Sequence, residues 1–313
     1  MPVLRLAWQS EGWYSIYVKL TSIEIIKILR AAGFTAYWAG GCVRDMLLGI
    51  TPKDFDIATS ARPDDLKKLF KKIHPIGEKY GVVVAEHGGH HFEIATFRSD
   101  SGYSDGRRPD AVLFTNAEQD ARRRDFTINA LFYDPLEDKI FDFVGGQEDL
   151  KNKLVRFIGD PAERIKEDHL RIIRAIRFKN TFGFQYHPET YNALKTHAKL
   201  SAKVSSERIR EELNKMIVHE SFPHAVNDME DTGVLAEVLP EIQVMKGVAQ
   251  PIEFHTEGDV YDHTLRALKA LKPTDQILTR WAVFLHDVGK PETFKIAERI
   301  RFDQHSEASA ETA

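Results

Sequence analysis

Two aspartates separated by a single residue give the strongest chemical signal in this 313-residue chain. Asp54 and Asp56 lie in the segment DFDIAT, which reads as a β-strand, and residues i and i+2 of a strand point to the same face. Two neighbouring carboxylates repel each other and need a shared proton or a cation between them. Magnesium is held in proteins by one or two carboxylates plus substrate phosphates. The pair predicts a magnesium site, with an acidic strand edge exposed to solvent as the alternative.

A glycine pair followed by an arginine lies upstream of these aspartates. Gly40 and Gly41 fall between an expected strand and an expected helix, and Arg44 is in the first turn of that helix. A glycine turn lets backbone N–H groups approach an anion closely, and a guanidinium offers a planar fork of donors. The combination predicts a phosphate contact, and a tight turn without a ligand is the alternative.

A third signal is a row of charged residues at helical spacing. Four of them recur every three residues beside an apolar row that includes Leu170, Ile173 and Ile176: Asp168, Arg171, Arg174 and Arg177. This spacing predicts an amphipathic helix with a narrow charged stripe. The alternative is a solvated face on which Asp168 and Arg171 form a weak ion pair.

Composition and charge limit the classes of protein to consider. The formal net charge is −4, which excludes a uniformly basic nucleic-acid binder, but residues 1–215 sum to +4 and residues 216–313 to −8. The single cysteine, Cys42, permits no intrachain disulfide and is typical of a cytoplasmic protein. No apolar run approaches the roughly 18 residues of a membrane helix, so no membrane partner is expected.

The order of the expected elements predicts an α+β fold. A mixed sheet with helices extends to about residue 150, and almost entirely helical material follows from about residue 160. Within the first part we expect a helix over 22–32 ending at Gly33, a helix over 63–72, a hairpin at Gly88–Gly89 and a mobile loop over 99–110. His87, His90 and His91 flank the hairpin turn; we favour a polar hairpin over a metal cluster there.

Four segments in this order resemble those of the class II tRNA nucleotidyltransferases and their poly(A) polymerase relatives: AGGCVRD at 39–45, DFDIAT at 54–59, RRDFTINA at 123–130 and EDHLR at 167–171. That family belongs to the nucleotidyltransferase superfamily related to DNA polymerase β. The resemblance implies a polymerase-β-like catalytic head over 22–150. It also implies an all-helical neck and body over 151–250, which selects the nucleotide and binds tRNA.

The resemblance also implies roles for individual residues. Asp54 and Asp56 would hold two magnesium ions as catalytic residues, with Glu93 as a third acidic position beside them. Asp168 and Arg171 would read the Watson–Crick edge of the incoming base. The implied nucleotide-binding residues are Gly40, Gly41, Arg44, Arg124, Asp125, Asn129, Asp168, Arg171, Arg174 and Arg177.

The implied activity is addition of C and A to the 3′ end of tRNA from CTP and ATP, by two-metal nucleotidyl transfer without a template. The segment DGRRPD at 105–110 resembles the flexible loop of enzymes that add the terminal A, and the helix over 206–212 resembles one that braces the nucleotide-binding helix. The alternatives within the family are an A-adding tRNA nucleotidyltransferase and a poly(A) polymerase.

A second resemblance covers the last sixty residues. HTEGDVYDHT at 255–264 and HDVGKP at 286–291 resemble the HD superfamily of metal-dependent phosphohydrolases. The resemblance implies a divalent metal at His263, His286 and Asp287, with His305 where some members place another ligand, in a truncated helical HD domain over 251–313. It gives an alternative of a different class, in which the chain is a metal-dependent phosphohydrolase.

Overall fold

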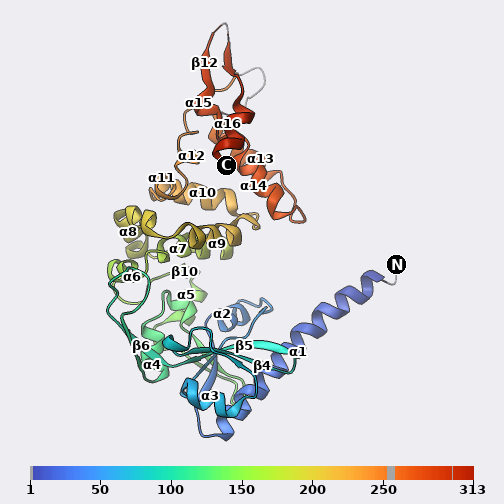
Figure 1. The fold of residues 1–313 in the computed structure, drawn as a ribbon, viewed down its shortest axis with the longest axis vertical. Helices are drawn as coiled ribbons and strands as arrows, with labels where there is room; N and C mark the ends of the chain where they lie inside the picture. The colour runs from blue at the N-terminus through green and yellow to red at the C-terminus, as the bar shows by residue number, and fades with distance from the viewer. Residues whose placement is uncertain (1–2, 252–257, 298) are drawn as a thin grey trace. The chain divides into compact units, whose positions relative to one another are not determined.

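The computed structural model describes residues 3–251, 258–297 and 299–313, and the chain forms two compact units (Figure 1). The first unit runs to Glu167 and the second begins at Asp168. Helix α6 (Pro161–Glu167) therefore belongs to the first unit, although the predicted head ends at residue 150. The predicted boundary at residue 250 lies inside the second unit and stays a prediction.

The first unit is built on a seven-stranded sheet in the order β3-β4-β5-β2-β1-β8-β9. The pair β2–β5 is parallel and the other recorded pairs are antiparallel, which is the mixed sheet of the predicted α+β class. The strands are β1 (Ala36–Ala39), β2 (Ile57–Thr59), β3 (Ile73–His74), β4 (Val82–His87), β5 (His90–Thr96), β8 (Phe132–Asp134) and β9 (Lys139–Phe141).

The two faces of this sheet differ. Trp38, Ile57 and Ile94 are opposite one another in the register, and their side chains are all buried on one face. The other face carries Glu93 and His91 of β5, the third strand of the sheet, and both side chains are exposed. We call this second side the open face after its exposed part, although a buried cluster that includes Ala39, Ala58 and Phe132 covers it at β1 and β8. The residues with chemical potential lie on the exposed part.

Helix α1 (Val3–Ala31) is longer than the predicted helix over 22–32. Its buried positions within the described side chains, from Val18 to Leu29, follow the helical spacing i, i+3, i+4, i+7, i+8 and i+11: Val18, Thr21, Ser22, Ile25, Ile26 and Leu29. The Ser22 hydroxyl accepts a hydrogen bond from the indole nitrogen of Trp38 at 3.0 Å. The helix ends as predicted before Gly33, which has a φ of 86°.

The predicted loop over 99–110 is partly strand. β6 (Arg98–Ser101) pairs with β7 (Ala111–Phe114), which leaves residues 102–110 as the connection. The Asp105 carboxylate accepts hydrogen bonds from the backbone N–H groups of Arg107 and Arg108, at 2.8 and 2.7 Å. The remaining elements of the unit are α2 (Gly41–Leu47), α3 (Pro63–Leu69), η1 (Glu78–Tyr80), α4 (Ala117–Arg122), η2 (Thr127–Asn129), α5 (Gly146–Lys151) and β10 (Leu154–Val155).

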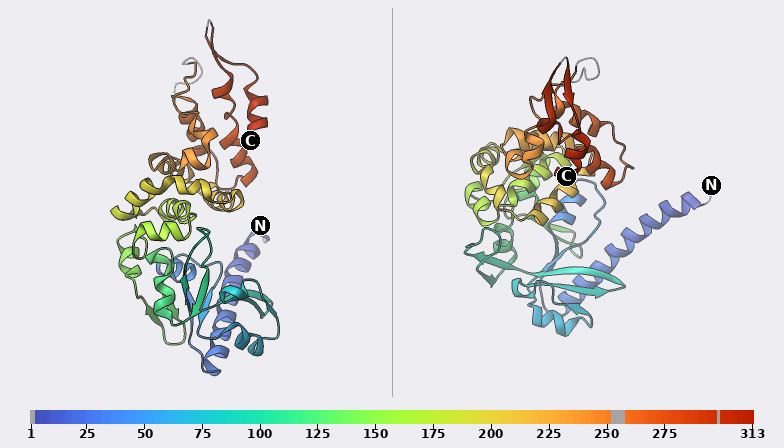
Figure 2. Two further views of the ribbon diagram at one scale, coloured as in Figure 1. Left: turned by 60° about the vertical axis from the view of Figure 1, so that its left-hand side comes forward. Right: turned by 45° about the horizontal axis from the view of Figure 1, so that its top comes forward.

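The second unit is mainly helical, and its helix α7 (Arg171–Phe182) contacts α9 (Ser206–Ile217) and α10 (Phe222–Asp231). The prediction of an all-helical neck and body over 151–250 is wrong at two short strands, β10 (Leu154–Val155) and β11 (Gln185–Tyr186). The prediction of a helical region over 251–313 is wrong where β12 (Phe294–Ile296) and β13 (Ile300–Phe302) form a hairpin (Figure 2). The other elements are α8 (Pro188–His197), η3 (Ala198–Lys203), α11 (Leu235–Val238), α12 (Pro240–Gln243), α13 (Val260–Lys269), α14 (Ile277–Leu285), α15 (Lys290–Thr293) and α16 (His305–Thr312).

Candidate active site

Asp54 and Asp56 lie immediately before strand β2, not within it as the sequence predicts. The alternation expected of a strand is nevertheless present, because Phe55 is buried against Trp38 while both aspartates are exposed. The carbonyl of Asp56 accepts a hydrogen bond from the backbone N–H of Ala39 at 3.0 Å, which extends the pairing with β1. The two carboxylates therefore share the open face with Glu93.

The three carboxylates concentrate negative charge at this point. The pKa of Asp56 is raised to about 6, first because the surrounding protein desolvates the carboxylate, and then because Glu93 and Asp54 add like charge; Arg124 opposes the shift. Among the described residues, no ion pair is recorded for Asp54, Asp56 or Glu93. A bound cation would offset the repulsion among these three carboxylates. Mg²⁺ needs only one or two carboxylate ligands when a phosphate supplies further ligands.

This charge cluster predicts a cost in stability. The folded state holds the Asp56 proton more tightly than the unfolded chain, so the contribution of this group to the free energy of unfolding falls as pH rises from about 4 to about 6 and stays low above that. In protein freed of divalent ions with EDTA, we expect Asp56→Asn to raise the melting temperature at pH 8. The gain in the free energy of unfolding should be no more than about 1 kcal/mol, because solvent screens the charges at this site.

Thermal denaturation followed by circular dichroism at pH 4.5 and pH 8 measures the effect. Asp64→Asn, at the exposed start of α3, is the matched control and should leave the difference between the two pH values unchanged. A lower melting temperature for Asp56→Asn at pH 8 contradicts the electrostatic account.

The glycine turn and Arg44 lie where the sequence places them, between β1 and α2. Arg44 is buried, and its Nη1 donates to the side-chain oxygen of Asn129 at 2.5 Å, while Nε and Nη2 donate to Asp45 at 2.9 and 2.7 Å. The arginine is thus anchored by its neighbours, and Asn129, another predicted site residue, fixes its direction.

Arg124 and Asp125 complete the predicted group in the first unit. Arg124 Nη1 donates to the Asn129 carbonyl at 3.2 Å, and the Asp125 carboxylate accepts from the Asn129 amide at 3.1 Å. Asn129 therefore links Arg44, Arg124 and Asp125. The structure brings together around this asparagine the residues predicted from two separate segments.

Asp120 is a residue of this group that sequence reasoning missed. It is buried and pairs with Arg124 at 3.0 Å and with Arg123 at 2.7 Å. Burial acts to raise the pKa of Asp120, but the two guanidinium groups outweigh it and lower the pKa. The spacing of Asp120 and Arg124, four residues apart at the end of a helix, is the signal that could have identified the pair.

Gly40 is the position where a side chain would disturb the site most directly. Its φ of 71° and ψ of −123° are accessible to glycine, and an added Cβ would lie 2.9 Å from Arg124 Nη1. We expect Gly40→Ala to cost about 1–3 kcal/mol of stability and to displace Arg124. Gly33→Ala is the matched control, since Gly33 also has a positive φ but no atom within 4 Å of its Cβ position.

Urea denaturation of both variants, with nucleotide binding by calorimetry, tests this prediction. Loss of stability in both variants, with loss of nucleotide binding only in Gly40→Ala, is the expected pattern. Equal binding by the two variants shows that the turn at Gly40 has no part in the site.

Asp168 in the second unit precedes helix α7 and is not part of the predicted helical stripe, because the helix begins at Arg171. Its carbonyl accepts the first helical hydrogen bond from the backbone N–H of Arg171, at 3.0 Å. Both oxygens of its carboxylate accept from Arg208, at 2.9 and 2.8 Å, in a bidentate pair. Arg208 lies forty residues away in the sequence, and no local spacing signals the contact.

Arg174 and Arg177 lie on α7 and meet the buried Glu212 of α9. Arg177 Nε donates to Glu212 at 2.5 Å, and Arg174 Nη1 is 3.9 Å from the other carboxylate oxygen. Burial acts to raise the pKa of Glu212, but the arginines lower it on balance. The segment 206–212 thus supplies partners for Asp168 and for two of the arginines, as a bracing helix requires.

Family models match two segments of the chain, which leave out residues 157–182 and so Asp168, Arg174 and Arg177. Residues 36–156 match the family model "Poly A polymerase head domain", and residues 183–245 match "Probable RNA and SrmB- binding site of polymerase A". The CCA-adding enzyme of Lactobacillus helveticus is 44% identical over 234 residues, which is 74% of this chain and 58% of that enzyme. The two matched segments are similar to poly(A) polymerase domains, and the curated relatives that they match are CCA-adding enzymes.

Further CCA-adding enzymes extend the similarity. That of Geobacillus thermodenitrificans is 37% identical over 87% of this chain and 64% of its own length. The crystal structure of the Bacillus stearothermophilus CCA-adding enzyme in complex with CTP has a TM-score of 0.71 at 33% identity, covering 87% of this chain and 64% of that one. A tRNA nucleotidyltransferase complexed with a primer tRNA and an incoming ATP analog has a TM-score of 0.58 at 25% identity, covering 81% and 78%. The chain spans about three fifths of the length of the first two relatives.

The C-terminal histidines lie beyond the segments that match the two family models. His263, His286 and Asp287 each offer a ligand atom, and these atoms lie within 4.8 Å of one another. Asp287 also pairs with Lys290 at 2.7 Å, a partner that sequence reasoning missed. Although burial acts in the other direction, hydrogen bonds from His286 and Lys290 lower the pKa of Asp287 to about 2. Part of the predicted motif, 255–257, lies outside the described residues.

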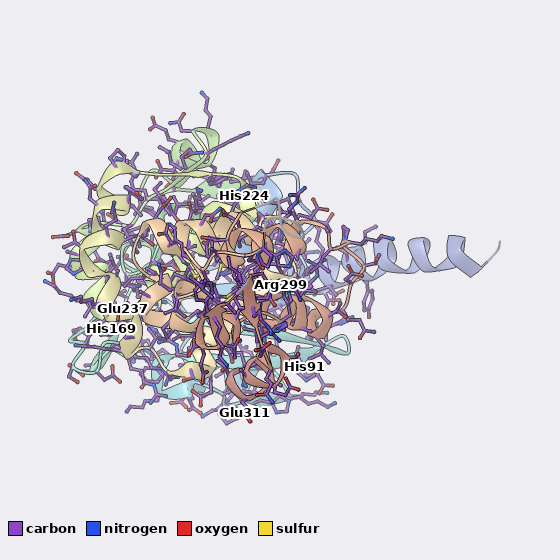
Figure 3. The ribbon with its side chains drawn as sticks, turned by 90° about the horizontal axis from the view of Figure 1, so that it is seen from above. His91, His169, His224, Glu237, Arg299 and Glu311 are labelled. Atoms are coloured by element: carbon purple, nitrogen blue, oxygen red, sulfur yellow. The ribbon has the colours of Figure 1, made fainter. Side chains whose placement is uncertain are left out.

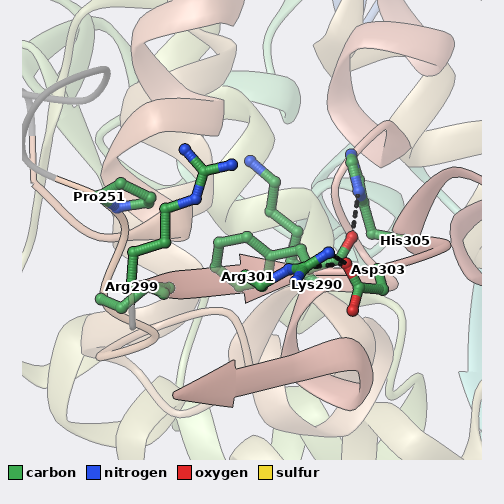
Figure 4. A pocket seen from close by; sticks show the side chains of 8 residues that line it. Pro251, Lys290, Arg299, Arg301, Asp303 and His305 are labelled. Atoms are coloured by element: carbon green, nitrogen blue, oxygen red, sulfur yellow. Dashed lines mark hydrogen bonds and ion pairs between the residues drawn. The ribbon is translucent and has the colours of Figure 1, made fainter. Parts of the chain in front are cut away.

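A pocket of about 470 Å³ lies beside this cluster (Figure 4). Its lining includes Lys290, Arg299, Arg301 and His305, with Asp303 as the acidic residue. Arg301 pairs with Asp303 at 3.1 Å, so part of the positive charge is compensated.

Among the described residues, no helix is both long enough and apolar enough to cross a membrane.

Proposed function

We propose that this chain is a template-independent tRNA nucleotidyltransferase that adds C and A to the 3′ end of tRNA from CTP and ATP. The observation that carries the proposal is the group of Asp54, Asp56 and Glu93 on the open face, in a chain 44% identical to a CCA-adding enzyme over 234 residues. The CTP and the primer tRNA in the structures of relatives support the choice of substrates.

The residues of the open face fit a magnesium site. Asp54 and Asp56 would hold two Mg²⁺ ions, and Glu93 would lie beside them. His263, His286 and Asp287 have three ligand atoms within 4.8 Å of one another, whereas Asp54, Asp56 and Glu93 form no such group within the described residues. Phosphate oxygens of the substrate would therefore complete the magnesium site. When bound, the ions supply charge stabilisation for the transferring phosphoryl group.

The remaining residues would position the two substrates. A 3′-hydroxyl oxygen of the tRNA forms a bond to the α-phosphorus, and the bond from that phosphorus to pyrophosphate breaks. The donor groups of Arg44 and Arg124, on either side of Asn129, would bind the triphosphate, with Gly40, Gly41 and Asp125 shaping this subsite. Positioning and charge stabilisation account for most of the rate in such a transfer.

Base selection is assigned to the second unit. A carboxylate has about four lone-pair sites. Arg208 uses two of those of Asp168 and the backbone N–H of Leu170 a third, at 3.1 Å, so Asp168 retains capacity to accept one hydrogen bond from an exocyclic amino group. Arg171 would donate to the acceptor edge of the same base, and Arg174 and Arg177 would contact the nucleotide. Cytosine carries such an amino group at C4 and adenine at C6, whereas uracil at C4 and guanine at C6 have a carbonyl oxygen, which cannot donate to Asp168.

The organisation that we propose for this activity is a head over 22–150, a neck and body over 151–250, and an HD-like region over 251–313.

The activity is tested by incubating the purified chain with tRNAs that end before CCA, after the first C and after CC, with CTP, ATP or both. Extension of all three substrates is expected. Labelling of the CC-ended tRNA alone identifies an A-adding enzyme, and long A tails on unrelated RNA identify a poly(A) polymerase.

A metal-dependent phosphohydrolase is a second candidate, favoured by the convergence of His263, His286 and Asp287 beside the basic pocket. The ligand types fit a divalent metal. Lys290 already compensates the Asp287 carboxylate, however, which weakens the fit. The two activities separate by mutation: Asp54→Asn should abolish nucleotide incorporation, whereas His286→Ala should affect only phosphate release from a generic phosphoester.

A further inference from the structure

A separate group of metal-ligating side chains lies on the open face, in the three strands at the β3 end of the sheet. His74 of β3, Glu86 of β4 and His91 of β5 each offer one ligand atom, and the three atoms lie within 4.8 Å of one another. The exposed His91 is labelled in Figure 3. None of the groups assigned to nucleotidyl transfer or to the HD-like region includes these residues.

The strand register is what brings the three together. Glu86 lies directly opposite His91 in the β4–β5 hairpin. His74 lies opposite Val84, which precedes Glu86 by two residues and so points to the same face. A directly opposed pair and a diagonal neighbour are within side-chain reach on one face of a sheet. The positions are therefore set by the backbone pairing of three strands.

The geometry suits a small, late first-row ion. Zinc binds imidazole nitrogen and carboxylate oxygen at about 2.0–2.2 Å, which separates two ligands of a tetrahedron by roughly 3.4 Å. The three atoms already lie within 4.8 Å of one another, and His74 and His91 are exposed, so rotation about their side-chain bonds can close the difference. Two imidazoles favour such an ion over magnesium, which prefers oxygen ligands.

Glu86 offers an accessible carboxylate to a cation. Lys72 Nζ donates to its Oε1 at 2.6 Å, but the Lys72 side chain is exposed, unlike the buried Lys290 beside Asp287, and it can move away as a cation binds. The other carboxylate oxygen of Glu86 can also accept a cation without displacing Lys72.

We propose that His74, Glu86 and His91 form a binding site for a zinc-like divalent ion, with three protein ligands and an open fourth position. Bound metal would tie the two-residue edge strand β3 to the β4–β5 hairpin and stabilise the folded state by mass action. This site differs from the cluster considered at the hairpin turn. The other two histidines at the hairpin turn have other contacts. His87 Nε2 lies 3.3 Å from Glu24 Oε2, and the centroid of the His90 ring lies 5.4 Å from that of Tyr17.

The test uses the untagged full chain carrying His263→Ala and His286→Ala, which removes the other histidine-containing group. CoCl₂ and ZnCl₂ are titrated by calorimetry, and Co²⁺ is followed by its visible absorption and by broadening of histidine ring signals in NMR spectra. We expect a site that broadens the rings of His74 and His91. Adding His74→Ala and His91→Ala should weaken this binding at least about a hundredfold.

His87→Ala with His90→Ala is the matched control, because it removes two histidines from the same hairpin, and it should leave binding unchanged. Glu86→Gln is a milder variant that keeps the fold if the double alanine variant loses it, and it should also weaken binding. Three results would overturn the proposal. The variants could all bind the metal with equal strength, the metal could broaden only the ring signals of other histidines, or no histidine ring could take part in binding. Since this site shares no residue with the nucleotidyltransferase site, its failure leaves the proposed function untouched.

Discussion

Asp56→Asn is expected to reduce incorporation of CMP into tRNA by about a thousandfold or more. The substitution keeps the size of the side chain but removes the charge that would hold a divalent ion beside Asp54. Loss of several kcal/mol of transition-state stabilisation corresponds to this factor in rate. Single-turnover incorporation of labelled CMP, measured with saturating tRNA and CTP, gives the rate directly.

Two features make this prediction specific. The same substitution is expected to make the metal-free protein slightly more stable, because it relieves repulsion from Glu93 and Asp54. A large loss of activity with no loss of stability is therefore the signature of a functional carboxylate. Asp64→Asn should retain full activity. Activity within tenfold of the unsubstituted chain in Asp56→Asn contradicts the assignment of this residue to the metal site.

Asp168→Asn is expected to change which nucleotides are used, in addition to how fast they are used. The amide offers one acceptor where the carboxylate offered two, and it weakens the bidentate pair with Arg208. We expect the ratio of kcat/KM for CTP to kcat/KM for UTP to fall by at least about a hundredfold, because this discrimination depends on hydrogen bonds to the base edge. Steady-state kinetics with each of the four nucleotides measures the ratio.

Arg208→Ala provides the comparison that separates base reading from support. It leaves the Asp168 carboxylate in place but removes its bracing partner, so all four nucleotides should lose rate more evenly. Asp231→Asn, at the exposed end of α10, is the surface control. If Asp168→Asn lowers kcat/KM by the same factor for every nucleotide, Asp168 has a structural role only.

Local signals in the sequence predicted the local features of the structure. The Gly88–Gly89 turn pairs His87 with His90, and Gly33 ends α1, because positive-φ glycines act within a few residues of where they stand. The alternation of Asp54, Phe55 and Asp56 was also predictable. Their position before β2 was not, because where strand pairing begins depends on the partner strand.

Partners from distant segments escaped the sequence reasoning. Arg208 meets Asp168, and Glu212 meets Arg177, only after α9 packs on α7. The resemblance at 206–212 indicated a bracing helix, but no spacing within either segment specifies these residue pairs. His74 was missed for a related reason, since a two-residue strand carries no periodic signal and its register with Val84 emerges only in the sheet. Asp120 is different, because its spacing of four residues from Arg124 could have predicted their ion pair from the sequence.

The family resemblance supplied what spacing alone left open. DFDIAT indicated a cation site, but the assignment to nucleotidyl transfer came from the order of four segments, and the matched head domain at 36–156 contains three of them in full. The histidines at the C-terminal end show the limit of such reasoning. Lys290 turns a metal-ligand motif into a cluster with its own internal counterion.

The central claim is tested most directly by sequencing the 3′ ends of a tRNA that lacks CCA, after incubation with this chain, Mg²⁺ and all four nucleoside triphosphates. The account predicts products that end in C, CC and CCA and stop there, with no U or G incorporated, and predicts no extension with Asp54→Asn or Asp56→Asn. Unextended tRNA, or tails that differ from CCA, would contradict it.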